Sequence, residues 1–274
     1  MPLPRKTKMI RSLLVLLVLS LATILVFAVK KKPEKKKAAA EIWHPLNADP
    51  WQELDLVTQY MKNAMPYTQQ VRALLLSEND ALLEERTFTT AYYDNATMLY
   101  RIEGTEMVNT RQWQAIIDHD QQYAAINPPN VIASGVGFDL GMLKKLFTDN
   151  GFSLEVKQNQ KGQKMLSSDN FTNGTMTGMQ LVYDASTGMV ISVRLGMPHI
   201  EQDPDGEKMP DSSLLQGLSI KTVSESLELE YKPLEKLTAE QVKNGPDSYF
   251  TIKKKQLKGV DKRFEGYRVI NNIQ

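Results

Sequence analysis

Residues 86–129 read RTFTTAYYDNATMLYRIEGTEMVNTRQWQAIIDHDQQYAAINPP, and this stretch decides the fold. Within it, residues 88–92 and 98–102 place successive side chains on two faces with a period of two, which is the spacing of a β-strand. The pairs Asp94-Asn95 and Glu103-Gly104 lie between such runs and are typical of tight turns. The stretch therefore predicts an antiparallel meander.

The composition excludes several classes of site. The chain of 274 residues contains no cysteine, so disulfides, thiolate metal sites and cysteine nucleophiles are ruled out. The net charge of +1 hides two opposite regions, because residues 1–37 hold ten Lys or Arg against Glu34, which leaves the remaining residues at about −8. A mildly acidic domain does not favour a nucleic acid as partner.

The amino-terminal segment predicts a membrane anchor. Residues 12–29, SLLVLLVLSLATILVFAV, carry no charge, and a helix of that length spans about 27 Å, close to the thickness of the hydrocarbon core. A cleaved signal peptide is the alternative, although its apolar run is usually shorter. We expect residues 1–11 in the cytoplasm and the rest outside the plasma membrane, in the periplasm, while the larger lysine cluster after the span argues for the opposite orientation.

Residues 30–48 predict a basic linker beside the membrane. Its KKKPEKKK run lacks the apolar periodicity that a packed element needs, so we expect a solvated spacer near anionic headgroups. The residues expected at the membrane surface are Lys30, Lys31, Lys32, Lys35, Lys36 and Lys37.

Residues 49–274 predict one β-rich domain that begins with a helix. Asp49 is a suitable N-cap and Pro50 suits the first helical position, so we expect a helix from Pro50 to about Ala64. A hairpin of residues 67–76 and 82–93 should follow, with a helix over 71–83 as the alternative.

The remaining chain continues with short elements. We expect short helices at 139–147 and after Thr238, a mobile surface loop at 197–213, and strands at 152–156, 176–183, 189–195, 216–231 and 264–270. Because strands and helices do not alternate, the fold class predicted is α+β, with one curved, antiparallel, unclosed-barrel-like sheet covered by short helices.

This order of elements resembles the bacterial periplasmic lipoprotein-carrier family, with its LolA-like fold. The resemblance rests on the helix at 50–64, the meander core VNTRQWQAIIDHDQQYAAI at 108–126 and the hairpin LVYDASTGMVISVRL at 181–195. It implies an opening helix, an unclosed barrel and a concave apolar face that shelters an acyl chain. Two features depart from the family pattern, namely the predicted tether and the segment 236–274.

The only carboxylate–histidine cluster is Asp118-His119-Asp120. A metal site would also need His44 and His199, which lie in distant irregular segments, so a polar hairpin turn is the simpler interpretation. The chain has no GxSxG or SxxK motif for a nucleophilic serine. We therefore expect no catalytic residue, no metal and no cofactor.

Methionine and aromatic side chains are the candidates for an adaptable apolar groove, with ordinary core packing as the alternative. The predicted groove residues are Trp51, Met61, Met98, Tyr100, Trp113, Met142, Phe147 and Met179.

Taken together, these features predict a non-enzymatic, membrane-anchored, extracytoplasmic binding module, a subunit of a bacterial envelope assembly with envelope proteins as partners. One alternative is a tethered acceptor of an acyl chain or a lipoprotein. Another is a metal-dependent hydrolase that uses His119.

Overall fold

The computed structural model describes residues 41–129, 152–168, 177–200 and 222–273. The predicted anchor, its flanking lysines and the predicted helix at 139–147 lie outside these residues. Within the described ranges, no helix has the length and apolar character needed to cross a membrane.

The described elements begin with a short strand and a helix and continue almost entirely as strands. Their bounds up to the first gap are β1 His44–Pro45, α2 Pro50–Ala64, β2 Tyr67–Leu76, β3 Leu82–Tyr92, β4 Met98–Ile102, β5 Thr105–Asn109, β6 Gln114–Asp118 and β7 Tyr123–Asn127. The later bounds are β8 Glu155–Gln158, β9 Gln163–Ser168, β10 Gly178–Asp184, β11 Val190–Ile200, β12 Thr222–Tyr231, β13 Glu235–Lys236, α4 Ala239–Lys243, β14 Phe250–Lys253, β15 Gln256–Val260 and β16 Arg268–Asn271. Two 3₁₀ turns, Pro246–Ser248 and Lys262–Phe264, flank the β14–β15 hairpin.

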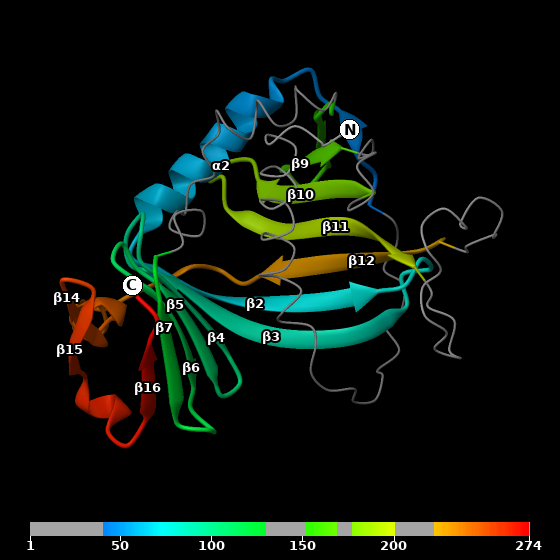
Figure 1. Cartoon of the computed structure of the whole chain (residues 1–274). Helices are drawn as coiled ribbons and strands as arrows, with labels where there is room; N and C mark the ends of the chain where they lie inside the picture. The colour runs from blue at the N-terminus through cyan, green and yellow to red at the C-terminus, as the bar shows by residue number, and fades with distance from the viewer. Residues whose placement is uncertain (1–40, 130–151, 169–176, 201–221, 274) are drawn as a thin grey trace, which may run out of the picture.

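One curved sheet dominates the described part of the chain (Figure 1). Its strand order is β1-β8-β9-β10-β11-β12-β2-β3-β4-β5-β6-β7-β16, and β13 pairs separately with β2. The meander predicted from residues 86–129 is confirmed, because β3 to β7 pair in sequence order and antiparallel. The α+β class and the unclosed curved sheet are likewise as predicted.

The prediction of a wholly antiparallel sheet is wrong at one edge. The last strand, β16, runs parallel to β7, with Val269 opposite Ala124. A parallel pair needs a crossover rather than a tight hairpin. The segment between β13 and β16, residues 237–267, leads the chain back to this edge, and β16 then enters the sheet in the direction of β7.

Helix α2 has the bounds that its sequence predicts. The side chain of Asp49 accepts a hydrogen bond from the backbone N–H of Trp51 at 2.9 Å, and Pro50 occupies the first turn. Met65 then adopts an extended conformation before Pro66, which ends the helix. Val57 is buried against β8 to β11, and this contact holds α2 on the sheet.

Two further predictions are corrected by the strands. The alternative helix at 71–83 is wrong, because these residues form the end of β2, the turn and the start of β3, where Val71 faces Phe88. The predicted loop at 197–213 begins too early, since residues 197–200 extend β11 and pair with β12; residues 201–213 lie outside the described ranges. Pairing along β12 continues through this segment despite Pro198.

The two faces of the sheet carry different layers. We call the face that contacts α2 the inner face and the opposite one the outer face. The outer face of β3 to β7 is covered by residues 237–267, and its core includes Trp113, Ile117, Phe250 and Phe264. Trp113 meets Phe250 edge to face at 5.3 Å between ring centroids, so this carboxy-terminal segment is packed as part of the domain.

Candidate functional site

An ion pair beneath α2 fixes the helix on the inner face. Glu53 lies 2.6 Å from the ammonium group of Lys164 on β9 and accepts a hydrogen bond of 2.6 Å from the hydroxyl of Tyr183 on β10. Burial alone would raise the pKa of Glu53, but the two hydrogen bonds outweigh it and lower this pKa. The carboxylate therefore stays ionised at neutral pH and joins the helix to two strands.

Beyond α2, the inner face continues as an uncharged row that crosses five strands. Residues opposite one another in an antiparallel ladder share a face. The register pairs Thr90 with Tyr100, Tyr100 with Met107, Met107 with Ile116, and Ile116 with Ala125. At about 4.8 Å between strands, the row is about 19 Å long.

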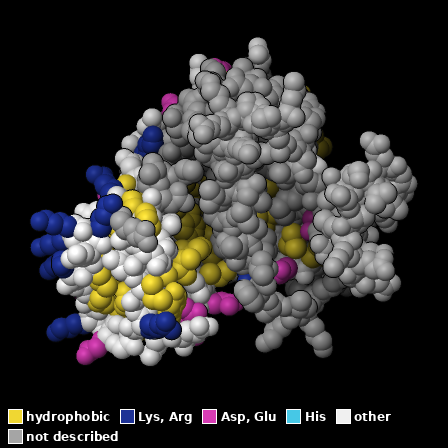
Figure 2. All heavy atoms as spheres, in the orientation of Figure 1, with side chains coloured by type: hydrophobic (Ala, Val, Ile, Leu, Met, Phe, Trp, Pro, Cys, Tyr) yellow, Lys and Arg dark blue, Asp and Glu magenta, His cyan; other side chains and the backbone are white. Residues whose placement is uncertain are grey.

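The side chains of this region form what we call the inner-face patch, which consists of Met98, Tyr100, Ile102, Met107 and Ile116. Ile116 is 49% exposed, and the other four are partly exposed. Figure 2 shows hydrophobic side chains gathered over the part of the molecule where β4 to β7 lie in Figure 1. Aliphatic and thioether side chains left open to solvent on one face are typical of a surface that binds a partner.

Polar side chains bound the patch on both sides along the strands. On one side, Asn109 lies opposite Met98 and Gln114, and Gln114 lies opposite Asn127. Asn109 is only 5% exposed, yet neither its amide nitrogen nor its amide oxygen has a hydrogen-bond partner among the described residues. On the other side, Asp118 pairs with Tyr123 in the ladder. A buried amide without partners is costly unless something else satisfies it.

Tyrosines line the inner face between the patch and α2. Tyr67 on β2 and Tyr92 on β3 lie opposite each other, with ring centroids 5.1 Å apart. Burial, and secondly the neighbouring phenols, raise the pKa of Tyr67, Tyr92 and Tyr231, and burial also raises that of Tyr100. These side chains are thus neutral at physiological pH, and they extend an uncharged surface toward the helix.

The structure brings together only part of the predicted groove. Met98 and Tyr100 belong to the inner-face patch. Trp51 and Met61 are partly buried on α2, and Met61 packs on the cluster around Val57. Trp113 lies elsewhere, because its indole is buried in the outer-face core.

Of the other predicted groove residues, Met179 lies on β10 opposite Leu195, away from the patch. Met142 and Phe147 fall outside the described residues. Prediction from sequence missed Ile102, Ile116 and Asn109 as members or neighbours of the patch. Their signal was the period-two pattern of the meander, but only the strand register places them in adjacent rows.

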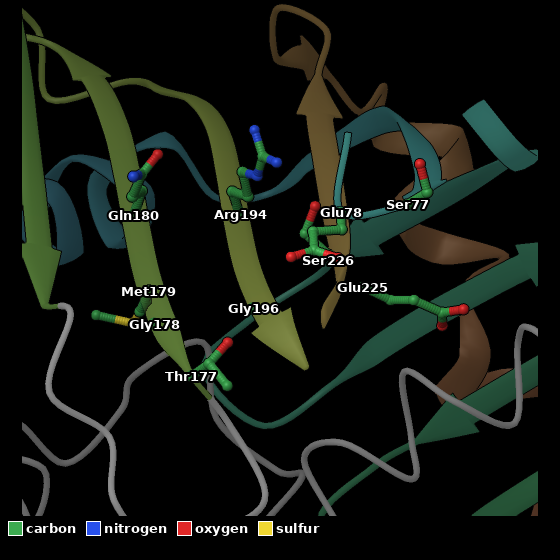
Figure 3. A pocket seen from close by; sticks show the side chains of 10 residues that line it. All are labelled: Ser77, Glu78, Thr177, Gly178, Met179, Gln180, Arg194, Gly196, Glu225 and Ser226. Atoms are coloured by element: carbon green, nitrogen blue, oxygen red, sulfur yellow. The ribbon is translucent and has the colours of Figure 1, made fainter. Parts of the chain in front are cut away.

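A separate pocket of about 270 Å³ lies at the ends of β10, β11 and β12 beside the β2–β3 turn (Figure 3). Gly178 and Gly196 face each other in the register, and their missing side chains open the space. A Cβ at Gly196 would lie 2.4 Å from the hydroxyl oxygen of Thr177, so the strand requires glycine there. Among the predicted groove residues that the structure describes, Met179 alone lines this pocket.

His119 takes part in a contact between the sheet and the carboxy-terminal segment. Its Nδ1 lies 2.9 Å from the hydroxyl oxygen of Tyr267, and its Nε2 lies 3.3 Å from a carboxylate oxygen of Glu106. Arg101 donates to the same oxygen at 2.6 Å. No set of three or more His, Asp or Glu side chains in the described ranges is arranged to hold a metal ion.

Comparison with known proteins finds no matching family model and no matching curated sequence. Solved structures that resemble the chain include an uncharacterized conserved protein from Thermus thermophilus, with 15% identity over 71% of this chain and 93% of that one, at a TM-score of 0.35. A LolA superfamily protein from Nitrosomonas europaea has 10% identity over 75% of this chain and 98% of its own, at a TM-score of 0.33.

A third solved structure is an outer membrane lipoprotein-sorting protein domain from Vibrio parahaemolyticus, with 10% identity over 72% of this chain and 98% of that one, at a TM-score of 0.30. The family that the element order resembles is therefore found among the structural neighbours of this chain.

Proposed function

We propose that the protein is a non-enzymatic binding module that holds an acyl chain of a lipid, or of a lipid-modified envelope protein, on the inner face of its sheet. The observation that carries this proposal is the uncharged row from Thr90 to Ala125, with Tyr100, Met107 and Ile116 partly open to solvent.

The dimensions and chemistry of the row suit an acyl chain. An acyl chain spans half of the roughly 30 Å hydrocarbon core, which is about 15 Å. The row is about 19 Å long, as four strand spacings require. Methionine adapts its shape to irregular apolar partners, so Met98 and Met107 suit chains of differing geometry.

The boundary of the patch suits the polar end of such a ligand. Asn109 offers an amide donor and an amide acceptor that no described residue satisfies. An ester or amide linkage beside an acyl chain would accept from the Asn109 nitrogen, and a neighbouring N–H or hydroxyl would donate to its oxygen. This would remove the penalty of a buried, unpaired amide.

The cellular setting follows from the sequence alone and remains a proposal. Residues 12–29 would anchor the chain in the plasma membrane, and the domain would lie outside the cytoplasm, in the periplasm. The lysines of residues 30–37 would lie at the membrane surface. A tethered domain would act as a fixed acceptor or as a subunit of an envelope assembly.

The experiment uses a lipopeptide and the same peptide without its acyl chain. The full chain is extracted from membranes into polymer discs without detergent, with Ile116→Cys carrying an environment-sensitive dye. The lipopeptide should shift the dye emission to shorter wavelength, because its acyl chain displaces water from the patch. The unacylated peptide should cause no such shift.

The control is Ile42→Cys, because Ile42 is 66% exposed and lies outside the patch. A dye at position 42 should not respond to either peptide. An equal response to both peptides at position 116 would instead indicate a surface for protein binding, and no response at position 116 would contradict the proposal.

A further inference from the structure

The carboxy-terminal segment carries a charge opposite to that of the domain it covers. Residues 236–274 hold nine Lys or Arg against four Asp or Glu, which gives +5. Residues 41–235 hold 14 Lys or Arg against 27 Asp or Glu, which gives −13. The domain therefore has a positive end, and Figure 2 shows Lys and Arg side chains gathered at the end where β14 and β15 lie in Figure 1.

The positive charge is concentrated at the turn of the β14–β15 hairpin. Lys253 pairs with Gln256 in the ladder, so Lys254 and Lys255 are the two central residues of the turn. Both have positive φ, at 48° and 64°. Such a two-residue turn favours Asn-Gly, and lysine in this conformation is strained. Backbone strain retained at an exposed turn indicates that the side chains serve a function.

The turn presents its lysines to solvent from a supported backbone. Lys253, Lys254 and Lys255 are all exposed, and no acidic side chain pairs with them in the described part of the chain. The side-chain amide of Asn271 on β16 donates to the backbone oxygen of Lys255 at 3.2 Å. This contact ties the turn to the edge of the sheet, so three ammonium groups point outward without an internal counter-ion.

We propose that this hairpin docks on an anionic lipid bilayer. The cluster consists of lysines, which act as point charges, rather than of arginines, which recognise a single phosphate through two parallel hydrogen bonds. A diffuse layer of anionic headgroups suits such charges.

Docking at this site also sets the orientation of the domain. In Figure 1, the β14–β15 hairpin and the amino-terminal end of the described chain lie at opposite ends of the molecule, and that end follows the predicted anchor and linker in the sequence. If the anchor inserts into the bilayer to whose surface the hairpin binds, the long direction of the domain lies parallel to the membrane plane. The acidic remainder of the domain would be repelled by anionic headgroups, which favours contact through the positive end.

The test measures how close the hairpin comes to lipid headgroups. The chain has no cysteine, so Thr251→Cys on β14 gives a single site for a fluorescent dye. The full chain is reconstituted in nanodiscs of phosphatidylcholine, with or without phosphatidylglycerol, that carry a nitroxide quencher on the headgroups. We expect quenching that requires phosphatidylglycerol and disappears at about 1 M salt, where the Debye length is about 3 Å.

The decisive variant is Lys254→Asn with Lys255→Gly, which removes two charges and installs the residues that the turn favours. Each lysine near an anionic surface contributes about fivefold to binding, so the variant should weaken docking roughly twenty-five-fold while the hairpin folds at least as well. The matched control is Lys62→Gln with Lys232→Gln, which removes two exposed lysines outside the carboxy-terminal segment. The dye in this control should be quenched as strongly as in the parent chain.

Two results would overturn the proposal. One is quenching that is equal with and without phosphatidylglycerol, or that survives the Asn-Gly substitution. The other is an absence of lipid quenching together with a change in dye emission on addition of poly-glutamate, which would assign the hairpin to an acidic protein. Neither result bears on acyl binding by the inner-face patch, which the dye at position 116 reports separately.

Discussion

The carboxylate of Glu53 on α2 accepts a hydrogen bond of 2.6 Å from the hydroxyl of Tyr183 on β10. The same carboxylate pairs with Lys164 on β9, and both of these side chains are largely buried. Helix and sheet are thereby joined by a charged contact as well as by the apolar packing of Val57. This contact holds α2 on the same face of the sheet as the inner-face patch, at β8 to β11.

The first prediction concerns the strength of this contact. Glu53→Gln should lower the free energy of unfolding by about 2–3 kcal/mol, because it leaves the buried ammonium group of Lys164 without a counter-ion. Urea unfolding monitored by circular dichroism measures this loss. Glu41→Gln is the control, since the Glu41–Lys161 pair is exposed and should contribute less than about 0.5 kcal/mol.

The second prediction concerns pH. Because the pKa of Glu53 is lower in the folded chain than its ordinary value of 4.5, its contribution to stability is complete above that value and is lost as the pH falls through the folded pKa. The difference in unfolding free energy between the parent chain and Glu53→Gln should therefore be constant near neutral pH and shrink below about pH 4. A difference that grew on acidification would contradict the assignment.

The third prediction concerns the hairpin turn. Lys254→Asn with Lys255→Gly should raise the free energy of unfolding by about 1 kcal/mol, because the two backbone conformations with positive φ then carry residues that adopt them readily. Thermal unfolding measures the gain. A loss of stability would show that the lysine side chains support the fold.

The fourth prediction separates the outer-face core from the inner-face patch. Trp113→Ala should cost about 3–5 kcal/mol, since the indole is 2% exposed and packs on Phe250. Ile116→Asp should cost less than about 1 kcal/mol, because its side chain is half exposed. Hydrogen exchange should also show earlier opening of β14 in Trp113→Ala, and equal losses for both variants would contradict the two-face arrangement.

Local signals allowed much of the fold to be predicted from the sequence. Asp49, Pro50 and Pro66 define both ends of α2, and the structure has the helix at the predicted residues. Thr238 and Gln241 form the predicted capping box at α4. The alternation over residues 88–92 and 98–102 predicted strands at β3 and β4, because a half-buried strand imposes a period of two on its side chains.

The remaining features depend on contacts between distant residues. β9 carries the polar sequence QKMLSS, and the β14–β15 hairpin is rich in lysine, so neither shows a clear apolar pattern. The side of the sheet on which Trp113 lies depends on a core formed with residues more than a hundred positions later. The inner-face patch likewise arises from the register of three strands, β4 to β6, which periodicity within one strand does not determine.

The central claim is that Met107 and Ile116 contact an acyl chain in the cell, and photo-crosslinking tests it most directly. The photo-crosslinking residue benzoylphenylalanine is introduced at position 116 of the full chain, or at position 42 as the control. Living cells that produce each variant are irradiated, and the crosslinked adducts of the protein are identified by mass spectrometry. We predict adducts that contain a fatty acyl group at position 116 and none at position 42. Adducts without an acyl group at position 116, or the same adducts at both positions, would contradict the account.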